Sequence, residues 1–213
     1  QNRAITREDY IARCYAMPSR FGTIAKAYII QDTQQDTMDQ LYPQDTISNP
    51  LALNLYTLGF NGAGKLVELN QALKENLRTY LSNFRMLTDA INIKAAHIVN
   101  IGINFVIIPK PDHNSNEVVL RCIDRLKTIL HTDRMQINGS INRSSLISEL
   151  DNVDGVQSVS DIELYNKFGG SYSNVVYDLE TAEKNNIIYP SLDPMIFEIK
   201  YPDTDIKGRI IKP

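Results

Sequence analysis

The stretch D-A-I-N-I-K-A-A-H-I-V-N-I-G-I-N-F-V-I-I-P, residues 89–109, decides the fold of this chain. Eight of the nine odd-numbered positions from Ile91 to Ile107 are apolar, while the even-numbered positions between them are mostly polar or small. This period of two predicts a β-strand with one face on a core and the other mostly solvated. At ~3.3 Å per residue the strand would run roughly 55 Å, so we expect it to bend or break, with a bulge at Gly102.

Composition indicates an ordinary globular protein. The chain has 213 residues, of which 43% are hydrophobic and 22% charged, enough to bury a core in one large domain or two small ones. The net charge of −3 argues against nucleic acid or an anionic membrane as a partner. We find no signal peptide and no apolar run near the ~20 residues that a membrane helix needs. Because the first residue is Gln1, we expect a fragment of a longer chain.

Residues 1–89 predict an N-terminal α/β part in the order helix, strand, strand, helix. Thr6 and Asp9 have the spacing of a capping box in front of a short amphipathic helix. The other elements are expected at 23–31 (strand), 51–58 (strand) and 66–85 (helix). Between the two strands, residues 32–50 are rich in Asp, repeat Gln-Asp-Thr and contain no basic residue, which predicts a mobile acidic loop.

Residues 90–165 predict a second domain with the order strand, helix, short strand, helix, strand. This order resembles a ferredoxin-like (split βαβ) layer of sheet and helices. The first helix is expected to begin at Asn114, and the second to be capped by Asn142 or Ser144. The predicted fold class is therefore α+β.

Residues 166–213 lack a helical period and predict a β-rich C-terminal extension. Two strands are expected, at 174–179 and at 195–201, and apolar side chains alternate along the second. Two strands alone are marginal in water, so they must dock on something. Either the chain's own ferredoxin-like domain or another subunit could supply that surface, and aromatic residues are the usual anchors between subunits. We take Tyr189, Met195, Phe197 and Tyr201 as the candidate interface residues.

One local motif suggests a different class of protein. G-F-N-G-A-G-K-L, residues 59–66, fits the phosphate-binding pattern G-x-x-x-x-G-K between a strand and the expected helix. The pattern also needs Ser or Thr after the lysine to hold magnesium, and that position is Leu66. We therefore favour a plain turn and keep a P-loop-like nucleotide-binding protein as the alternative function.

The other reactive side chains do not form a recognisable site. Cys14 and Cys122 fall on apolar helix faces, which indicates buried free thiols and a reducing compartment. His97, His113 and His131 share no metal-ligand spacing with each other or with the cysteines, and His97 is expected to be a core histidine. We expect no catalytic residue, no cofactor and no metal, and hence no enzyme.

Four blocks of the sequence resemble the baseplate J-like family, the wedge subunits in the baseplates of contractile phage tails. They are 6–29 (T-R-E-D-Y-I-A-R-C-Y-A-M-P-S-R-F-G-T-I-A-K-A-Y-I), 80–102, 144–159 (S-S-L-I-S-E-L-D-N-V-D-G-V-Q-S-V, a helix, then Gly-Val, then a strand) and 190–208. The last resembles the C-terminal end of the wedge protein of myoviruses. The blocks extend over nearly the whole chain, but residues 32–50 have no counterpart in the family.

The resemblance implies a structural subunit of a phage tail baseplate wedge. Such subunits assemble with themselves, as a homodimer or ring, and with other wedge subunits around the tail tube. The implied location is the tail baseplate of the virion, after synthesis in the cytoplasm of a bacterial host. The family implies no catalytic residues. An equivalent baseplate component of another contractile injection system is a further alternative.

Overall fold

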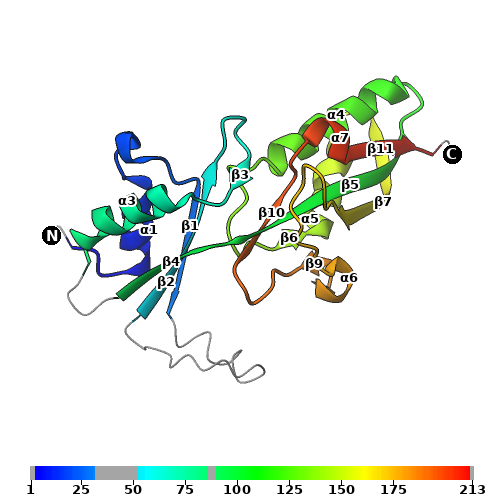
Figure 1. Cartoon of the computed structure of the whole chain (residues 1–213). Helices are drawn as coiled ribbons and strands as arrows, with labels where there is room; N and C mark the ends of the chain where they lie inside the picture. The colour runs from blue at the N-terminus through cyan, green and yellow to red at the C-terminus, as the bar shows by residue number, and fades with distance from the viewer. Residues whose placement is uncertain (1–2, 32–51, 86–89, 212–213) are drawn as a thin grey trace. The chain divides into compact units, whose positions relative to one another are not determined.

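The chain forms two compact units (Figure 1). Both contain helices and strands, which agrees with the predicted α+β class. The computed structural model describes residues 3–31, 52–85 and 90–211, so the predicted acidic loop 32–50 lies outside the described residues. The contacts divide the chain between Ala96 and His97. No helix in the described ranges is long and apolar enough to cross a lipid bilayer.

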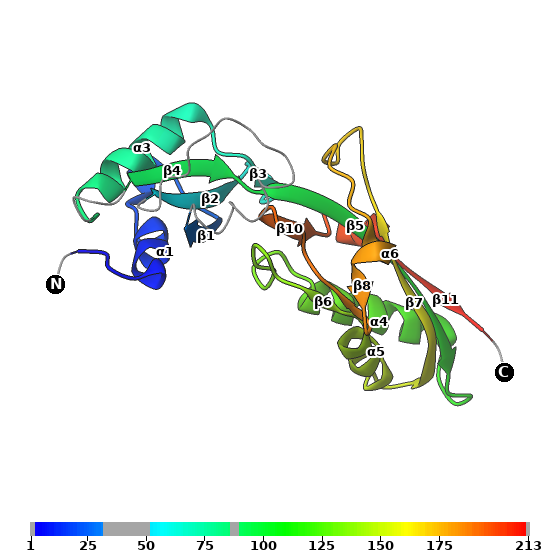
Figure 2. The same ribbon diagram turned by 90° about the horizontal axis from the view of Figure 1, so that it is seen from below.

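The N-terminal unit is a sheet with two helices packed against it. Its elements are α1 (Arg7–Tyr15), η1 (Ser19–Phe21), β1 (Lys26–Gln31), β2 (Ala52–Phe60), β3 (Leu66–Val67), α3 (Gln71–Ser82) and β4 (Ala90–Ala95). The central strand β2 pairs antiparallel with β1 and parallel with β4, and Figure 2 shows α3 running alongside this sheet. As predicted, α1 begins at a capping box, in which the Thr6 hydroxyl accepts from the Asp9 amide and the Asp9 carboxylate accepts from the Thr6 amide.

The two helices share one core with the sheet. α1 contributes Tyr10 and Cys14, and α3 contributes Leu77 and Leu81, all of them at most 1% exposed. These side chains pack against buried residues of β1 and β2. The apolar spacing along each helix therefore serves this core.

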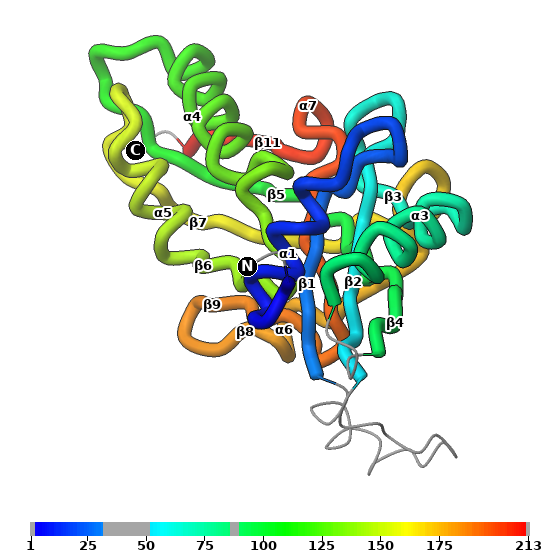
Figure 3. Tube along the Cα trace, turned by 90° about the vertical axis from the view of Figure 1, so that its left-hand side faces the viewer, coloured from blue at the N-terminus to red at the C-terminus, as the bar shows by residue number. Residues whose placement is uncertain are grey.

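The C-terminal unit is built around the long strand β5. Its elements are β5 (His97–Pro109), α4 (Ser115–Ile129), β6 (Ile141–Asn142), α5 (Arg143–Asp151), β7 (Val156–Asn166), α6 (Leu179–Ala182), β8 (Glu183–Lys184), β9 (Ile187–Ile188), β10 (Met195–Glu198), α7 (Pro202–Asp205) and β11 (Ile206–Ile210). β7 pairs antiparallel with β5, while β10 and β11 pair parallel with successive stretches of it. The short strands β6, β9 and β8 form a separate small sheet, and they lie together in Figure 3.

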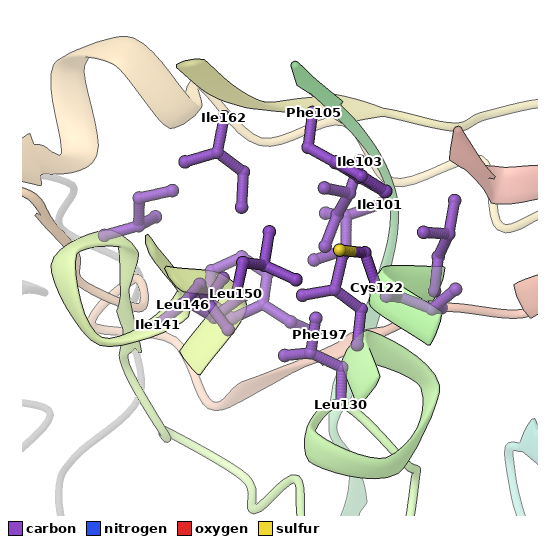
Figure 4. Close-up of a cluster of buried hydrophobic side chains, with 14 of the residues drawn as sticks. Ile101, Ile103, Phe105, Cys122, Leu130, Ile141, Leu146, Leu150, Ile162 and Phe197 are labelled. Atoms are coloured by element: carbon purple, nitrogen blue, oxygen red, sulfur yellow. The ribbon is translucent and has the colours of Figure 1, made fainter. Parts of the chain in front are cut away.

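Helices α4 and α5 pack on one face of β5. As predicted, Asn114 caps α4, and Asn142 rather than Ser144 caps α5. The odd-numbered residues of β5 from Val99 to Ile107 are buried in the core beneath these helices. Figure 4 shows part of this core, with Ile101, Ile103, Phe105, Cys122, Leu130, Leu146, Leu150, Ile162 and Phe197 labelled.

The predicted long strand does break, at Ala96, into β4 and β5, which belong to different units. The expected bulge at Gly102 is wrong. Gly102 pairs regularly with Tyr165, and the register shifts fall at Val106/Ile107 and Ile108/Pro109. A methyl group at Gly102 would lie 2.5 Å from Cζ of Tyr165, so this position is a glycine because the tyrosine ring lies over it.

The two units differ from the three parts expected from the sequence, 1–89, 90–165 and 166–213. Residues 90–95 form β4, which pairs with β2 and so belongs to the N-terminal unit. The segment 166–213 provides β10 and β11, which pair with β5. The strand expected at 174–179 is absent, since those residues are irregular up to Leu179, where α6 begins.

The even-numbered face of β5 is not uniformly solvated. Asn100 is only 1% exposed, because the segment that follows β7 lies over it. His97, expected in the core, is instead exposed at the start of the strand. The prediction of a solvated face therefore fails near the beginning of β5, where Asn100 lies.

Candidate interaction surface

The phosphate-loop motif lies in a β-hairpin. The expected start of the helix at Leu66 is wrong, because β3 follows the loop and pairs back onto the end of β2, and α3 begins only at Gln71. The Asn61 side-chain oxygen accepts from the backbone amides of Ala63 and Lys65, at 2.9 Å each, and the Gly64 amide donates to the Asn61 carbonyl. A phosphate-binding loop needs such amides to point at the ligand, in front of a helix. In this hairpin the amides instead donate to Asn61 within the turn.

We therefore expect no nucleotide binding by the hairpin at 59–67. Calorimetric titration with magnesium-ATP should give no heat of binding. Lys65→Ala should change the free energy of unfolding by less than about 0.5 kcal/mol, as an ordinary surface substitution does. A micromolar affinity in the unmodified chain that disappears in Lys65→Ala would contradict this prediction.

The two cysteines are poor nucleophiles. Burial raises the pKa of Cys14 to about 12 and that of Cys122 to about 11. Both thiols therefore stay protonated at neutral pH, whereas attack requires the thiolate.

Within residues 3–31, 52–85 and 90–211, no group of three His, Cys, Asp or Glu side chains is placed to hold a metal ion.

The four candidate interface residues separate into two kinds. Met195 and Phe197 are 2% and 1% exposed and belong to the core of the C-terminal unit. Tyr189 and Tyr201 are 47% and 38% exposed. Only the two tyrosines are on the surface of this unit, where another chain could reach them.

Strand β10 is held inside the unit from both sides. Its Met195 exchanges backbone and side-chain hydrogen bonds with Asn138, at 2.8 and 3.2 Å. The Phe197 ring lies with its centroid 6.0 Å from that of Tyr177. This strand docks on the chain's own domain, which is the first of the two alternatives that the sequence left open.

A buried polar group fixes the segment after β7 onto β5. The Asn100 side chain donates to Glu198 at 2.8 Å and accepts from the Ser173 amide at 2.7 Å. The Lys167 amide donates to the Asn100 carbonyl at 2.8 Å. Because Asn100 and Glu198 are both 1% exposed, these hydrogen bonds replace water that the residues have lost.

Asp205 makes a second group of polar contacts with the segment after β7. It is fully buried, and its carboxylate accepts from the Tyr172 hydroxyl at 2.7 Å and lies 3.5 Å from Nζ of Lys167. Burial, together with the hydrogen bond to Asp205, raises the pKa of Tyr172 to about 12. The Tyr172 ring in turn meets the edge of Tyr201 at 5.5 Å between centroids. The exposed Tyr201 is thus held in place from below.

Tyr189 borders an open depression of about 330 Å³. The Tyr177 hydroxyl donates to the Tyr189 carbonyl at 2.8 Å, which fixes the backbone there. The lining residues are Tyr177, Asp178, Thr181, Ala182, Lys184, Tyr189 and Pro190. A hollow that combines two tyrosines with a few polar and charged residues has the composition of a protein-binding surface.

The C-terminal segment also carries much of the exposed apolar surface. Of the eleven large hydrophobic residues that are exposed in the described ranges, six lie in it. They are Phe168, Val176, Tyr189, Leu192, Tyr201 and Ile211. The sequence pointed to this segment, but it did not indicate Asn100, Asp205 and Lys167, whose roles depend on partners far along the chain.

The fold is similar to that of a chain in the cryo-EM structure of the anti-feeding prophage (AFP) baseplate, which was symmetrised six-fold. The TM-score is 0.53 and the sequence identity 14%. The similarity covers 92% of this chain but only 38% of the AFP chain, so this chain spans well under half the length of its neighbour. No protein-family model and no curated protein matches the sequence.

Proposed function

We propose that this chain is a structural subunit of a phage tail baseplate wedge, which contacts itself and other wedge subunits around the tail tube. The observation that carries the proposal is the shared fold with a chain of the AFP baseplate, over 92% of this chain. The four sequence blocks that resemble wedge subunits support the same class independently. The proposed location is the tail baseplate of the virion.

We further propose that the subunit works by binding and without catalysis or a cofactor. Tyr189 and Tyr201 are the proposed anchors for a partner, since both are exposed while their backbones are fixed. Aromatic side chains on a fixed backbone have less conformational entropy to lose on binding, which favours them as anchors. Met195 and Phe197 support this surface from the core beneath it.

The test is co-expression with the other baseplate subunits from the same particle, followed by affinity capture and mass determination over a concentration series. We expect a complex with at least one baseplate subunit, or self-association. Tyr189→Asp should weaken that complex and leave the thermal unfolding of the chain nearly unchanged. A chain that is monomeric at every concentration and binds no baseplate subunit would contradict the proposal.

The AFP neighbour also favours a second candidate, the equivalent baseplate component of another contractile injection system. The two candidates share this chain's binding chemistry and differ in the particle that contains it. Genes for a phage head beside this gene would favour the first candidate, and their absence from a complete cluster would favour the second.

A further inference from the structure

The C-terminal unit has one sheet face on which neither α4 nor α5 packs. α4 and α5 pack on the odd-numbered face of β5, where residues from Val99 to Ile107 are buried. On the opposite face Asn104, Val106 and Ile108 are partly exposed. We call this surface, from Asn104 to Ile108 with its neighbours on β7 and β11, the open face.

The register of the sheet arranges the open face in rows. Asn104 lies between Lys207 of β11 and Glu163 of β7. Val106 lies in the next row, between Arg209 of β11 and Asp161 of β7. Side chains directly opposite one another in a sheet point to the same face. The open face therefore has a basic column, a neutral central column and an acidic column.

The basic column consists of two exposed side chains. Lys207 and Arg209 are exposed, and neither has an ion-pair partner among the residues that the structure describes. Glu163 accepts a long hydrogen bond, 3.5 Å, from the Asn104 side chain. Asp161 lies 3.3 Å from Arg143 and its side chain remains 63% exposed.

Charged side chains on a solvated sheet face are common, and by themselves they would indicate no partner. Three features distinguish this face. The signs are sorted by strand, the rows at Asn104 and Val106 are in register across the three strands, and the central column contains Val106 and Ile108. This arrangement is self-complementary, as an interface between two identical subunits must be.

We propose that the open face is a self-association surface, on which a second copy of this chain stacks its own open face. A two-fold axis parallel to β5, midway between the faces, places β11 of each copy opposite β7 of the other. Lys207 then faces the second copy's Glu163, and Arg209 faces its Asp161. A two-fold axis across the strands would instead place β11 on β11 and bring like charges together, so the charge pattern selects the first arrangement.

The stack would remove the central column from water. Two sheets that pack face to face lie ~10 Å apart, close enough for Val106 and Ile108 to meet their symmetry mates. The charged columns at the rim then set the orientation, since opposite charges favour only one of the two axes. This inference deepens the proposed function by naming the surface for the self-contact of the subunit.

Charge reversal provides the first test. The molar mass of the species that the 213-residue chain forms in solution is measured over a concentration series. Lys207→Glu and Glu163→Lys should each weaken self-association by roughly tenfold, because each replaces attractive pairs by repulsive ones. An equimolar mixture of the two variants should recover the affinity of the unmodified chain, since the two reversed charges then face each other between the copies and attract again. Added salt should weaken the unmodified dimer.

Cross-linking provides a second measurement that does not depend on affinity. Residues 207 and 163 are two strand spacings apart within one chain, roughly 10 Å, but face each other between copies. A short thiol cross-linker should therefore join Lys207→Cys chains to Glu163→Cys chains faster than it joins either variant to itself. The native Cys14 and Cys122 are buried and should not interfere.

The outcomes separate this inference from the proposed function. A chain that binds baseplate subunits but stays monomeric would overturn the open-face dimer and leave the proposed function standing. Self-association that neither charge variant weakens, or that the mixture fails to restore, would show that copies meet elsewhere. A chain that neither self-associates nor binds a baseplate subunit would overturn both.

Discussion

Phe197→Asp is expected to unfold the C-terminal unit rather than to release a folded subunit from its partners. Phe197 is 1% exposed and lies in the core with residues of β5, α4 and α5. An aspartate there would either bury a charge without a partner or force β10 off β5, and each costs several kcal/mol. Because native domains are stable by only about 5–15 kcal/mol, one such substitution is enough to unfold the unit.

Circular dichroism and urea titration of Phe197→Asp measure this loss directly. Tyr189→Asp is the matched control, because it introduces the same charge eight positions away at a side chain that is 47% exposed. The control should keep the cooperative unfolding transition of the unmodified chain. A Phe197→Asp variant that unfolds with the unmodified midpoint would place Phe197 on the surface and reverse this assignment.

Several features of the fold could be predicted because their causes are local. The capping box of Thr6 and Asp9 and the caps at Asn114 and Asn142 depend on residues at most three positions apart. The buried face of β5 follows from the alternation of apolar residues, which is a property of the strand alone. Together with the apolar helix faces, these signals indicated the α+β class.

The break at Ala96 could not be located in the same way. The alternation of apolar residues continues from Ile91 to Ile107, so the sequence offers no change of period at the boundary. The break exists because β4 pairs with β2 and β5 pairs with β7, β10 and β11, in two different sheets. Strand partners far along the chain decide this, and no local window contains them.

The hairpin at 59–67 also could not be predicted, although a sequence motif marks it. The glycine and lysine spacing is shared by a phosphate loop and by a tight turn, and Leu66 fits the apolar period of a helix. The structure is decided by Asn61, which closes the turn with three backbone groups and directs β3 back onto β2. An Asn at the start of a turn was the available signal, since its side chain commonly bonds backbone amides two residues on.

The candidate surface could be placed in the correct segment but not residue by residue. Apolar alternation in 195–201 requires burial of Met195 and Phe197, and both an intrachain core and a partner would satisfy it equally. The structure assigns these two to the core and leaves Tyr189 and Tyr201 exposed. Hydrophobicity alone carries no information on which surface supplies the burial.

Ile103→Ala is the second substitution with a large expected effect, about 2–5 kcal/mol of lost stability, as for other buried isoleucine truncations. Ile103 is fully buried at the centre of β5, between Ile206 and Leu164 in the neighbouring strands. Its side chain points into the core beneath α4 and α5, where a truncation leaves a cavity. Urea titration followed by circular dichroism gives the cost.

The two asparagines on the opposite face of β5, Asn100 and Asn104, should lose different amounts of stability when they are replaced by alanine. Asn104→Ala should cost far less than Ile103→Ala, because Asn104 is partly exposed and its side-chain hydrogen bond to Glu163 is long, at 3.5 Å. Asn100→Ala should cost about 1–3 kcal/mol, because it leaves the buried Glu198 carboxylate and the Ser173 amide without this partner. The expected order of cost is Ile103, then Asn100, then Asn104, because the first two are buried and the third is partly exposed, and because truncation of Ile103 also leaves a cavity. If Asn100→Ala were as mild as Asn104→Ala, the segment after β7 would not cover β5 in solution, and the exposed tyrosines would lose the support on which the proposed interface depends.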